Sequence, residues 1–326
     1  MPLTTQHAVL GTQSSQDRPA AILLMGPTAS GKTGIALELA RSLPVEIVSV
    51  DSALVYCGMN IGTAKPDAET RRRVRHHLVD VIDPTQNYSA ARFRDDALGI
   101  MADIVRRGRI PLLTGGTMLY VKALREGLSA LPAAHADTRA VIDAMAADVG
   151  WPAMHRELER IDPATAQRLD PNDAQRVQRA MEVFYLTGRP MSELIAAGKP
   201  VALPYRLVSL SLVPGERSVL HQRIARRFET MLELGLIDEV RQLRATYDLK
   251  PGLPSMRCVG YRQVWQYLDG EFDLGELREK AVAATRQLAK RQLTWLRSTQ
   301  DVREFDCLAA DLQVQVEAWL RQQLGH

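Results

Sequence analysis

Cysteine is scarce in this chain, which holds only Cys57, Cys258 and Cys307 among its 326 residues. The number is odd and no two cysteines have the CxxC spacing, so the sequence indicates neither a disulfide framework nor a cysteine zinc site. We therefore expect the protein to work in a reducing compartment.

Long apolar runs are also absent from the sequence. No stretch approaches the roughly 18 apolar residues of a membrane-spanning helix, and residues 1–18 lack the basic and apolar regions of a secretion signal. The sequence predicts a cytoplasmic protein without a membrane partner, with a flexible N-terminal arm over residues 1–18.

A large excess of one charge is missing too, because 41 Lys and Arg residues face 38 Asp and Glu residues and give a net charge of +3. The overall charge therefore neither requires nor excludes a polyanionic ligand. A basic binding surface has to be argued from individual residues.

Short apolar runs alternate with segments of helical spacing in the first part of the chain, which is typical of βαβ units and a largely parallel sheet. Strands are expected at Ala20–Met25, Val45–Val50, His77–Asp83, Ile110–Thr114 and Tyr205–Leu212. The predicted fold is an α/β, P-loop NTPase-like core made of residues 19–128 and 205–326, with helices in its C-terminal part.

Residues 129–204 interrupt this core with helical patterns and almost no β-branched runs. The expected helices are Ala136–Val149, Pro152–Arg160, Pro163–Leu169 and Asn172–Thr187. We interpret this stretch as a helical insertion domain.

A phosphate-binding loop is the clearest motif. The stretch Gly26, Pro27, Thr28, Ala29, Ser30, Gly31, Lys32 and Thr33 has two glycines followed by Lys and Thr, between an expected strand and an expected helix. Its backbone N–H groups and the helix N-terminus attract phosphate, Lys32 adds a mobile cation, and the Thr33 hydroxyl can bind Mg²⁺.

Two polar residues follow other expected strands, where ligands of parallel sheets bind. Asp51 ends the strand after the P-loop helix and is a candidate general base or magnesium ligand, or a surface acid capping a turn. Thr117 follows Gly115-Gly116 and is either a site hydroxyl or a helix N-cap.

Other polar residues carry weaker signals. Asp80 and Asp83 are placed like the acids of a Walker B strand, but Asp83-Pro84 is also an ordinary turn. His76-His77 is better explained as part of a solvated basic run than as a metal site, because neighbouring strand residues point to opposite faces.

Basic residues recur at helical spacing in three places, and together they favour a long anionic substrate. The rows are Arg217, Arg223 and Arg227; Arg176 and Arg179; and Arg286, Lys290 and Arg297, the last expected opposite a face with Trp295.

The residues alone thus indicate a P-loop enzyme that acts on phosphates or pyrophosphate. A small-molecule or nucleotide kinase and a non-catalytic RNA-binding protein remain open as alternatives, whereas the absence of an NKxD motif disfavours a signalling GTPase.

Seven blocks, spread in order over nearly the whole chain, resemble the bacterial tRNA dimethylallyltransferase (tRNA isopentenyltransferase) family. They are GPTASGKT at 26–33, DSALVYCGMNIGTAKP at 51–66, GGTMLYVKAL at 115–124, NDAQRVQRAMEV at 172–183, HQRIARRFETMLELGLIDEV at 221–240, RCVGYRQ at 257–263 and TRQLAKRQLTWLR at 285–297. Their joint specificity is high, although a P-loop by itself is shared by many activities.

The resemblance implies transfer of the dimethylallyl group of dimethylallyl diphosphate to the exocyclic N6 amine of the adenosine 3′ of certain tRNA anticodons, with Mg²⁺ as cofactor. Asp51 would be the general base, Thr117 a partner of the adenine amine, and Lys32 a stabiliser of the diphosphate with Arg217 and Arg223. A monomer that binds the tRNA anticodon stem-loop is expected.

The resemblance and the basic rows also imply a set of tRNA-binding residues, part of it in the insertion domain. The expected residues are Asp51, Ser52, Ala53, Leu54, Thr117, Arg139, Gln175, Arg176, Val177, Gln178, Arg179, Arg257, Cys258, Val259, Gly260, Tyr261 and Arg262. Many family members have Gln where this chain has Leu54, so an amide contact to the base is lost here.

Overall fold

The computed structural model describes residues 18–127, 131–198 and 202–325. Two compact units share the chain: the larger contains the residues up to Leu124 and from Pro204 onward, and the smaller spans Arg125–Leu203. The expected N-terminal arm lies outside the described residues, except for Arg18.

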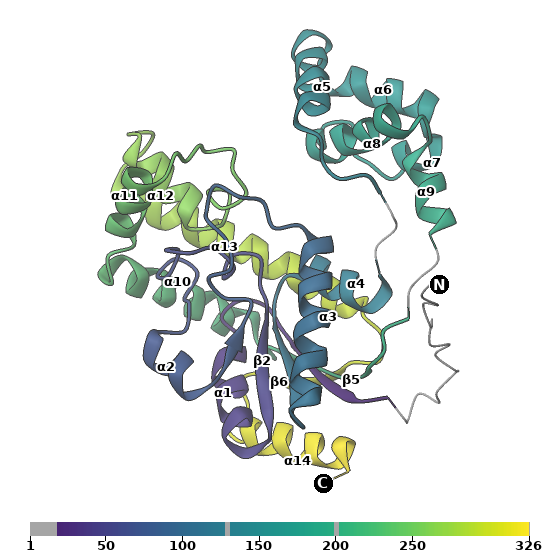
Figure 1. Ribbon diagram of the computed structural model, residues 1–326. Coiled ribbons are helices and arrows are strands. Elements are labelled where there is room, and N and C mark those ends of the chain that lie inside the picture. The colour runs from purple at the N-terminus through teal and green to yellow at the C-terminus, as the bar shows by residue number, and fades with distance from the viewer. Residues whose placement is uncertain (1–17, 128–130, 199–201, 326) are drawn as a thin grey trace, which may run out of the picture. The chain divides into compact units, whose positions relative to one another are not determined.

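A six-stranded sheet forms the centre of the larger unit, in the order β3-β2-β4-β1-β5-β6 with all neighbours parallel (Figure 1). The strands are β1 Ala20–Met25, β2 Val45–Val50, β3 His76–His77, β4 Ile110–Gly115, β5 Arg206–Val213 and β6 Arg303–Asp306. The predicted α/β class with a parallel sheet is confirmed. The P-loop follows β1 at the edge of the sheet where β2 and β4 also end, and parallel sheets bind their ligands at this edge.

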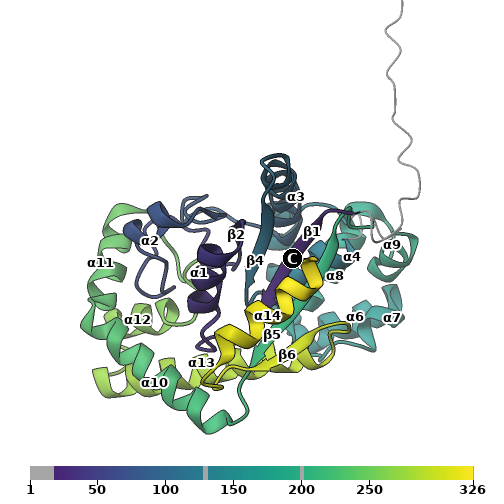
Figure 2. The same ribbon diagram turned by 90° about the horizontal axis from the view of Figure 1, so that it is seen from below.

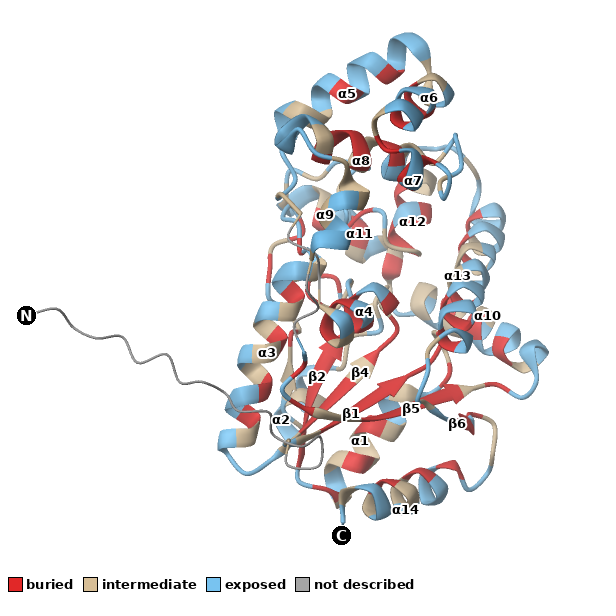
Figure 3. Cartoon of the chain, turned by 90° about the vertical axis from the view of Figure 1, so that its right-hand side faces the viewer, coloured by how far each residue is buried: buried red, intermediate tan, exposed pale blue. Residues whose placement is uncertain are grey.

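Helices cover both faces of this sheet. On one face lie α1 (Lys32–Ser42) and α14 (Leu312–Leu324), which share an apolar core with the alternate, inward residues of the strands (Figures 2 and 3). On the other face α3 (Ala90–Arg106) buries Phe93, whose ring stacks on Tyr120 of α4 (Met118–Glu126) with centroids 4.3 Å apart. Burial on both faces explains why the strands read as continuous apolar runs.

Five further helices complete the larger unit: α2 Ala68–Arg73, α10 Arg217–Glu233, α11 Leu236–Thr246, α12 Tyr261–Leu268 and α13 Leu274–Arg297. A capping box of Asp273 and Glu276 begins α13. Further along, Leu293 of α13 packs on Ile224 of α10, and Ala29 of the P-loop joins this cluster. The C-terminal part of the chain thus returns to the P-loop.

The prediction of a strand at His77–Asp83 is wrong. Only His76 and His77 pair with β2, and the following backbone enters the left-handed region at Leu78 (φ 60°) and Asp80 (φ 55°). Asp80, which lies in this bent segment, instead forms ion pairs with two side chains from earlier in the chain, Lys65 at 2.5 Å and Arg71 at 2.6 Å. Strand β6 was not expected, because only Phe305 of its four residues is buried.

The described residues of the smaller unit form helices only: α5 Ala136–Val149, α6 Trp151–Ile161, α7 Pro163–Ala166, α8 Ala174–Thr187 and α9 Met191–Ala197. The expected helical character holds, although α7 is shorter than expected and α9 was missed. Ile142, Leu158, Val177 and Met181 lie in its buried core. Its function in tRNA binding stays a prediction.

Candidate active site

A cavity of about 240 Å³ lies where β1, β2 and β4 end. Its walls come from the P-loop and α1, from Asp51 and its loop, from the end of β4, and from α10 and α13. The lining residues are Thr28, Ala29, Gly31, Lys32, Thr33, Ala36, Ile47, Ser49, Asp51, Leu54, Thr63, Ala64, Pro66, His76, Val79, Thr114, Gly115, Gly116, Arg227, Leu288 and Gln292. The phosphate loop and Asp51 therefore face one space, as their positions after parallel strands predict.

The P-loop has the shape of an anion cradle. Gly31 adopts φ 87° at the N-cap of α1, a left-handed conformation that glycine takes without steric penalty. A Cβ at Gly26 would lie 2.7 Å from Ser30 Oγ and 2.8 Å from the Leu212 carbonyl, so only glycine fits there. Ser30 Oγ is buried and has no hydrogen-bond partner among the described residues, which leaves it for a ligand.

Lys32 folds back over this loop, and its Nζ donates to the carbonyls of Gly26 at 2.8 Å and Pro27 at 2.6 Å. Loss of hydration lowers the pKa of its ammonium to about 8, the nearby Asp51 carboxylate raises it, and the Arg227 guanidinium lowers it. Burial also lowers the pKa of Arg227, while Asp51 raises it. Two cations and one carboxylate thus face each other across the cavity.

Asp51 begins the loop that follows β2. Its Oδ1 accepts hydrogen bonds from the N–H groups of Ala53 at 2.8 Å and Leu54 at 3.4 Å, so the local turn occupies one carboxylate oxygen. Thr117 is its neighbour at the end of β4: the Thr117 hydroxyl accepts from Ser52 N–H at 2.9 Å and donates to Ser52 Oγ at 3.2 Å. Asp51 and Thr117 are thereby brought together.

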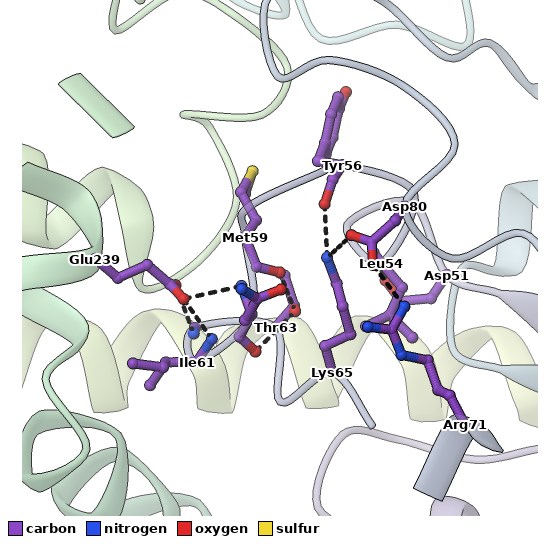
Figure 4. A network of polar contacts seen from close by, with 12 residues as sticks. Asp51, Leu54, Tyr56, Met59, Ile61, Thr63, Lys65, Arg71, Asp80 and Glu239 are labelled. Atoms are coloured by element: carbon purple, nitrogen blue, oxygen red, sulfur yellow. Dashed lines mark hydrogen bonds and ion pairs between the residues drawn. The ribbon is translucent and has the colours of Figure 1, made fainter. Parts of the chain in front are cut away.

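The loop from Asp51 to Pro66 is anchored at two points (Figure 4). Glu239 of α11 accepts the N–H groups of residues 60, 61 and 62 and the Tyr261 hydroxyl, the last at 2.5 Å. Lys65, whose side chain is 1% exposed, donates to the Tyr56 carbonyl and pairs with Asp80. Asp80 therefore holds the loop and does not line the cavity.

Two site residues were missed or undervalued. Arg227 was recognised only as part of a basic row, but it lines the cavity, whereas Arg217 and Arg223 do not. Both of these lie exposed near the start of α10, and Arg223 makes one 3.5 Å bond to the Cys307 carbonyl. Gln292 has no signal in the sequence beyond its place in the block 285–297 that resembles the family, yet its amide bonds two walls of the cavity.

Within the smaller unit, several expected tRNA-binding residues have structural contacts. Val177 is 0% exposed and its side chain lies in the buried core, so a tRNA contact at this residue stays a prediction. Arg139 and Arg179 both pair with the buried Glu182, at 2.8 and 2.5 Å. Gln178 donates to Asp143 of α5, whereas Arg176 is exposed and pairs with Asp173, the N-cap of α8.

The block 257–262 divides in the same way. Arg257 and Arg262 are exposed, and Val259 is partly buried. Tyr261 is 0% exposed and binds Glu239, so its side chain is structural, and a tRNA contact at this residue stays a prediction. Burial raises the pKa of the Cys258 thiol to about 12, which keeps it uncharged near Asp51, while Gly260 is the buried N-cap of α12.

The remaining candidates are placed as follows. His76 lines the cavity, and burial lowers its pKa, whereas His77 lies 2.8 Å from Glu46; neither is a solvated basic residue. Asp83 caps the turn at Thr85. Arg286, Lys290 and Arg297 are exposed along α13, and Trp295, on the opposite side of this helix as expected, is exposed as well.

A metal ion has to be judged from the donors present. No group of three or more His, Cys, Asp or Glu side chains could hold a metal within the described ranges. Thr33, at the start of α1, is exposed and lines the cavity, so its hydroxyl is placed to act as a ligand. One hydroxyl beside an anion cradle fits Mg²⁺, which usually takes few protein ligands and several oxygens from phosphates and water.

Comparison with known proteins identifies the family. The family described as IPP transferase matches residues 54–299, a range that excludes the P-loop. A tRNA dimethylallyltransferase of Nitrosospira multiformis is 62% identical over 302 residues, covering 93% of this chain and 94% of that protein. Another, of Chromobacterium violaceum, is 65% identical over 283 residues, covering 86% and 87%. The chain belongs to the tRNA dimethylallyltransferase family.

Solved structures of the family agree. The full-length tRNA isopentenylpyrophosphate transferase of Bacillus halodurans has a TM-score of 0.69 at 37% identity, with 94% of this chain and 97% of that one covered. A eukaryotic dimethylallyltransferase acting on tRNA has a TM-score of 0.78 at 26% identity, covering 94% and 79%. The predicted enzyme class, a tRNA prenyltransferase with a P-loop NTPase-like fold, is confirmed. In the part of the chain that is described, no helix has the length and apolar character needed to cross a membrane.

Proposed function

We propose that this tRNA dimethylallyltransferase uses dimethylallyl diphosphate as donor and the N6 amine of the adenosine 3′ of the anticodon as acceptor. The observation that carries the proposal is the single cavity that joins the P-loop, Lys32 and Arg227 to the Asp51 carboxylate. A phosphate cradle beside a carboxylate suits a reaction in which diphosphate leaves and a proton is removed.

The residues of the P-loop wall of the cavity bind and stabilise the diphosphate leaving group. As the bond between the allylic carbon and the diphosphate oxygen breaks, negative charge grows on diphosphate, and Lys32, Arg227 and the loop N–H groups stabilise it. Mg²⁺, held by Thr33 with the diphosphate oxygens, would supply further positive charge to the leaving group. Apolar cavity residues such as Ile47 and Leu54 are suited to contact the prenyl chain.

The acceptor adenine is bound by the opposite wall of the cavity, which contains Asp51. The adenine must leave its stack to enter such a cavity, at a cost of a few kcal/mol. Its N6 forms the new bond to the allylic carbon and gives its proton to Asp51, whose Oδ1 is already held by the turn. Thr117, bonded to Ser52, lies beside Asp51 and is the second polar partner for the amine.

Recognition of tRNA is proposed for the exposed basic residues. Arg176 of the smaller unit, Arg257 and Arg262 near α12, and the row Arg286, Lys290 and Arg297 on α13 are accessible for phosphate contacts. Leu54 lines the cavity and offers the base an apolar surface.

Replacement of Asp51 by Asn tests the proposal. The Asn Oδ1 can still accept from Ala53 and Leu54, so the turn is kept while the base is lost, and general-base catalysis contributes roughly 10² to 10⁴ in rate. We expect single-turnover transfer from dimethylallyl diphosphate to unmodified tRNA to fall by that factor, with tRNA affinity little changed.

Asp67→Asn is the matched control, because Asp67 also accepts a backbone N–H, at the N-cap of α2 outside the cavity. It should transfer at the unaltered rate. Replacing the donor by labelled ATP should leave the tRNA unlabelled. Label transfer from ATP would support the kinase alternative, and a full transfer rate in Asp51→Asn would refute the assigned base.

A further inference from the structure

Gln292 lies near the C-terminal end of α13 and is 8% exposed. Its Oε1 accepts a hydrogen bond from Thr28 N–H, and its Nε2 donates to the Gly116 carbonyl, both at 2.8 Å. One buried amide therefore connects the P-loop with the segment after β4.

These two segments carry opposite halves of the proposed reaction. Thr28 belongs to the loop that would hold the diphosphate. The Gly116 carbonyl is joined by one peptide bond to Thr117, whose hydroxyl binds Ser52 next to Asp51.

The surroundings of the Gln292 amide restrict which side chains can replace it. A Cβ on Gly116 would overlap Nε2 of Gln292, although the backbone of Gly116 is not in the left-handed region. A carboxylate at position 292 could accept from Thr28 but could not donate to Gly116, and an apolar side chain could do neither. The site therefore requires a group that donates on one side and accepts on the other.

We propose that Gln292 is a positioning residue that sets the distance between the donor diphosphate and the acceptor amine. This inference rests on the proposed function. Gln292 takes no part in bond making; it keeps the reacting carbon and nitrogen in line, and a misplacement of about 1 Å can cost 10²-fold in rate.

The first test uses Gln292→Met, which keeps the buried volume and removes both hydrogen bonds. We expect single-turnover transfer to fall by about 10², while the dissociation constants of donor and tRNA change less than about threefold and thermal unfolding stays cooperative. Gln292→Glu keeps the acceptor but places a carboxylate oxygen against the Gly116 carbonyl, so its transfer rate should fall at least as far as that of the Met variant. Transfer at the unaltered rate in the Met variant would overturn the proposal, and so would a loss confined to substrate affinity.

A double-mutant cycle gives an independent test. Gly116→Ala should displace the Gln292 amide and reduce transfer as Gln292→Ala does, whereas the double variant, where the overlap is relieved, should be no slower than Gln292→Ala. Gly115→Ala is the control, because its Cβ would overlap the Val50 backbone and Gln292→Ala cannot relieve this. Independent, multiplying effects of Gly116→Ala and Gln292→Ala would contradict the mechanism. Failure of the unaltered protein to transfer at all would instead refute the proposed function.

Discussion

Lys32 makes diphosphate binding depend on pH in a direction that the structure defines. Burial lowers the pKa of its ammonium to about 8 in the free protein. A bound diphosphate attracts the charged form, so binding should raise this pKa and take up a proton. The last proton of inorganic diphosphate also titrates in this alkaline range, so the contribution of the lysine is the difference between the unaltered protein and a variant whose cation does not titrate.

The magnitude follows from the fraction of charged lysine. With a pKa of about 8, the charged fraction falls from about 0.9 at pH 7 to about 0.09 at pH 9, and the affinity should fall about tenfold, or about 1.4 kcal/mol. At pH 9, binding should take up about 0.9 proton if the pKa in the complex exceeds 10.

Isothermal titration calorimetry with inorganic diphosphate at constant Mg²⁺ measures both the affinity and the number of protons taken up on binding. Affinities at pH 7, 8 and 9, in two buffers of different ionisation enthalpy, give the slope and the proton uptake. Lys32→Arg is the matched control, because an arginine stays charged throughout this range, and its affinity should not follow the same slope. An equal pH dependence of affinity and equal proton uptake in the unaltered protein and in Lys32→Arg would refute the reasoning.

The stability of the free protein should change in the opposite direction. A lysine pKa that is lower in the folded than in the unfolded state means that the unfolded chain binds more protons between pH 8 and 10.5, so stability rises with pH in this window. Relative to Lys32→Met, the unaltered protein should gain up to about 3 kcal/mol over these 2.5 pH units. Below pH 8 the charged Lys32 carries the whole penalty.

Two other predictions concern stability and tRNA binding. Glu239→Gln should lower the free energy of unfolding by about 1–3 kcal/mol in urea, because an amide donor would face backbone donors of the loop; an unchanged midpoint would contradict the anchor. Arg176→Ala should leave stability unchanged and reduce the slope of log tRNA affinity against log salt by about 0.7 to 0.9, whereas Arg179→Ala should destabilise the protein, because Glu182 is buried. Equal salt slopes for Arg176→Ala and the unaltered protein would show that Arg176 contacts no phosphate.

The sequence could predict those parts of the fold whose signal is local. β1, the P-loop and α1 follow from an apolar run, glycines and helical spacing in adjacent residues. The bend at Leu78–Asp80 could not be predicted, since it depends on Lys65 and Arg71 binding Asp80 from earlier in the chain. A run of apolar and acidic residues there reads as a strand, and long-range ion pairs decide otherwise.

The same distinction applies to the site. Asp51 was found because a strand end and a carboxylate coincide in the sequence. For Arg227, the period of the helix identified a basic row but not which member faces inward, and that depends on how α10 packs on α13. Arg179 and Tyr261 read as surface residues by type. Arg179, however, pairs with Glu182 three residues further along α8, whose burial depends on tertiary packing, and Tyr261 binds Glu239 on another helix.

Charge balance explains why these parts belong in one cavity. Lys32 and Arg227 contribute two positive charges and Asp51 one negative charge, so the net charge of the free site is +1. Burial already disfavours the charged form of the lysine. A prenyl diphosphate brings about three negative charges, so a divalent cation beside Thr33 would bring the loaded site near neutrality. In the proposed reaction, proton transfer to Asp51 removes one negative charge as diphosphate gains one by leaving its carbon. The net charge of the cavity would then stay constant through the reaction, which a low-dielectric site favours because uncompensated charge there is costly.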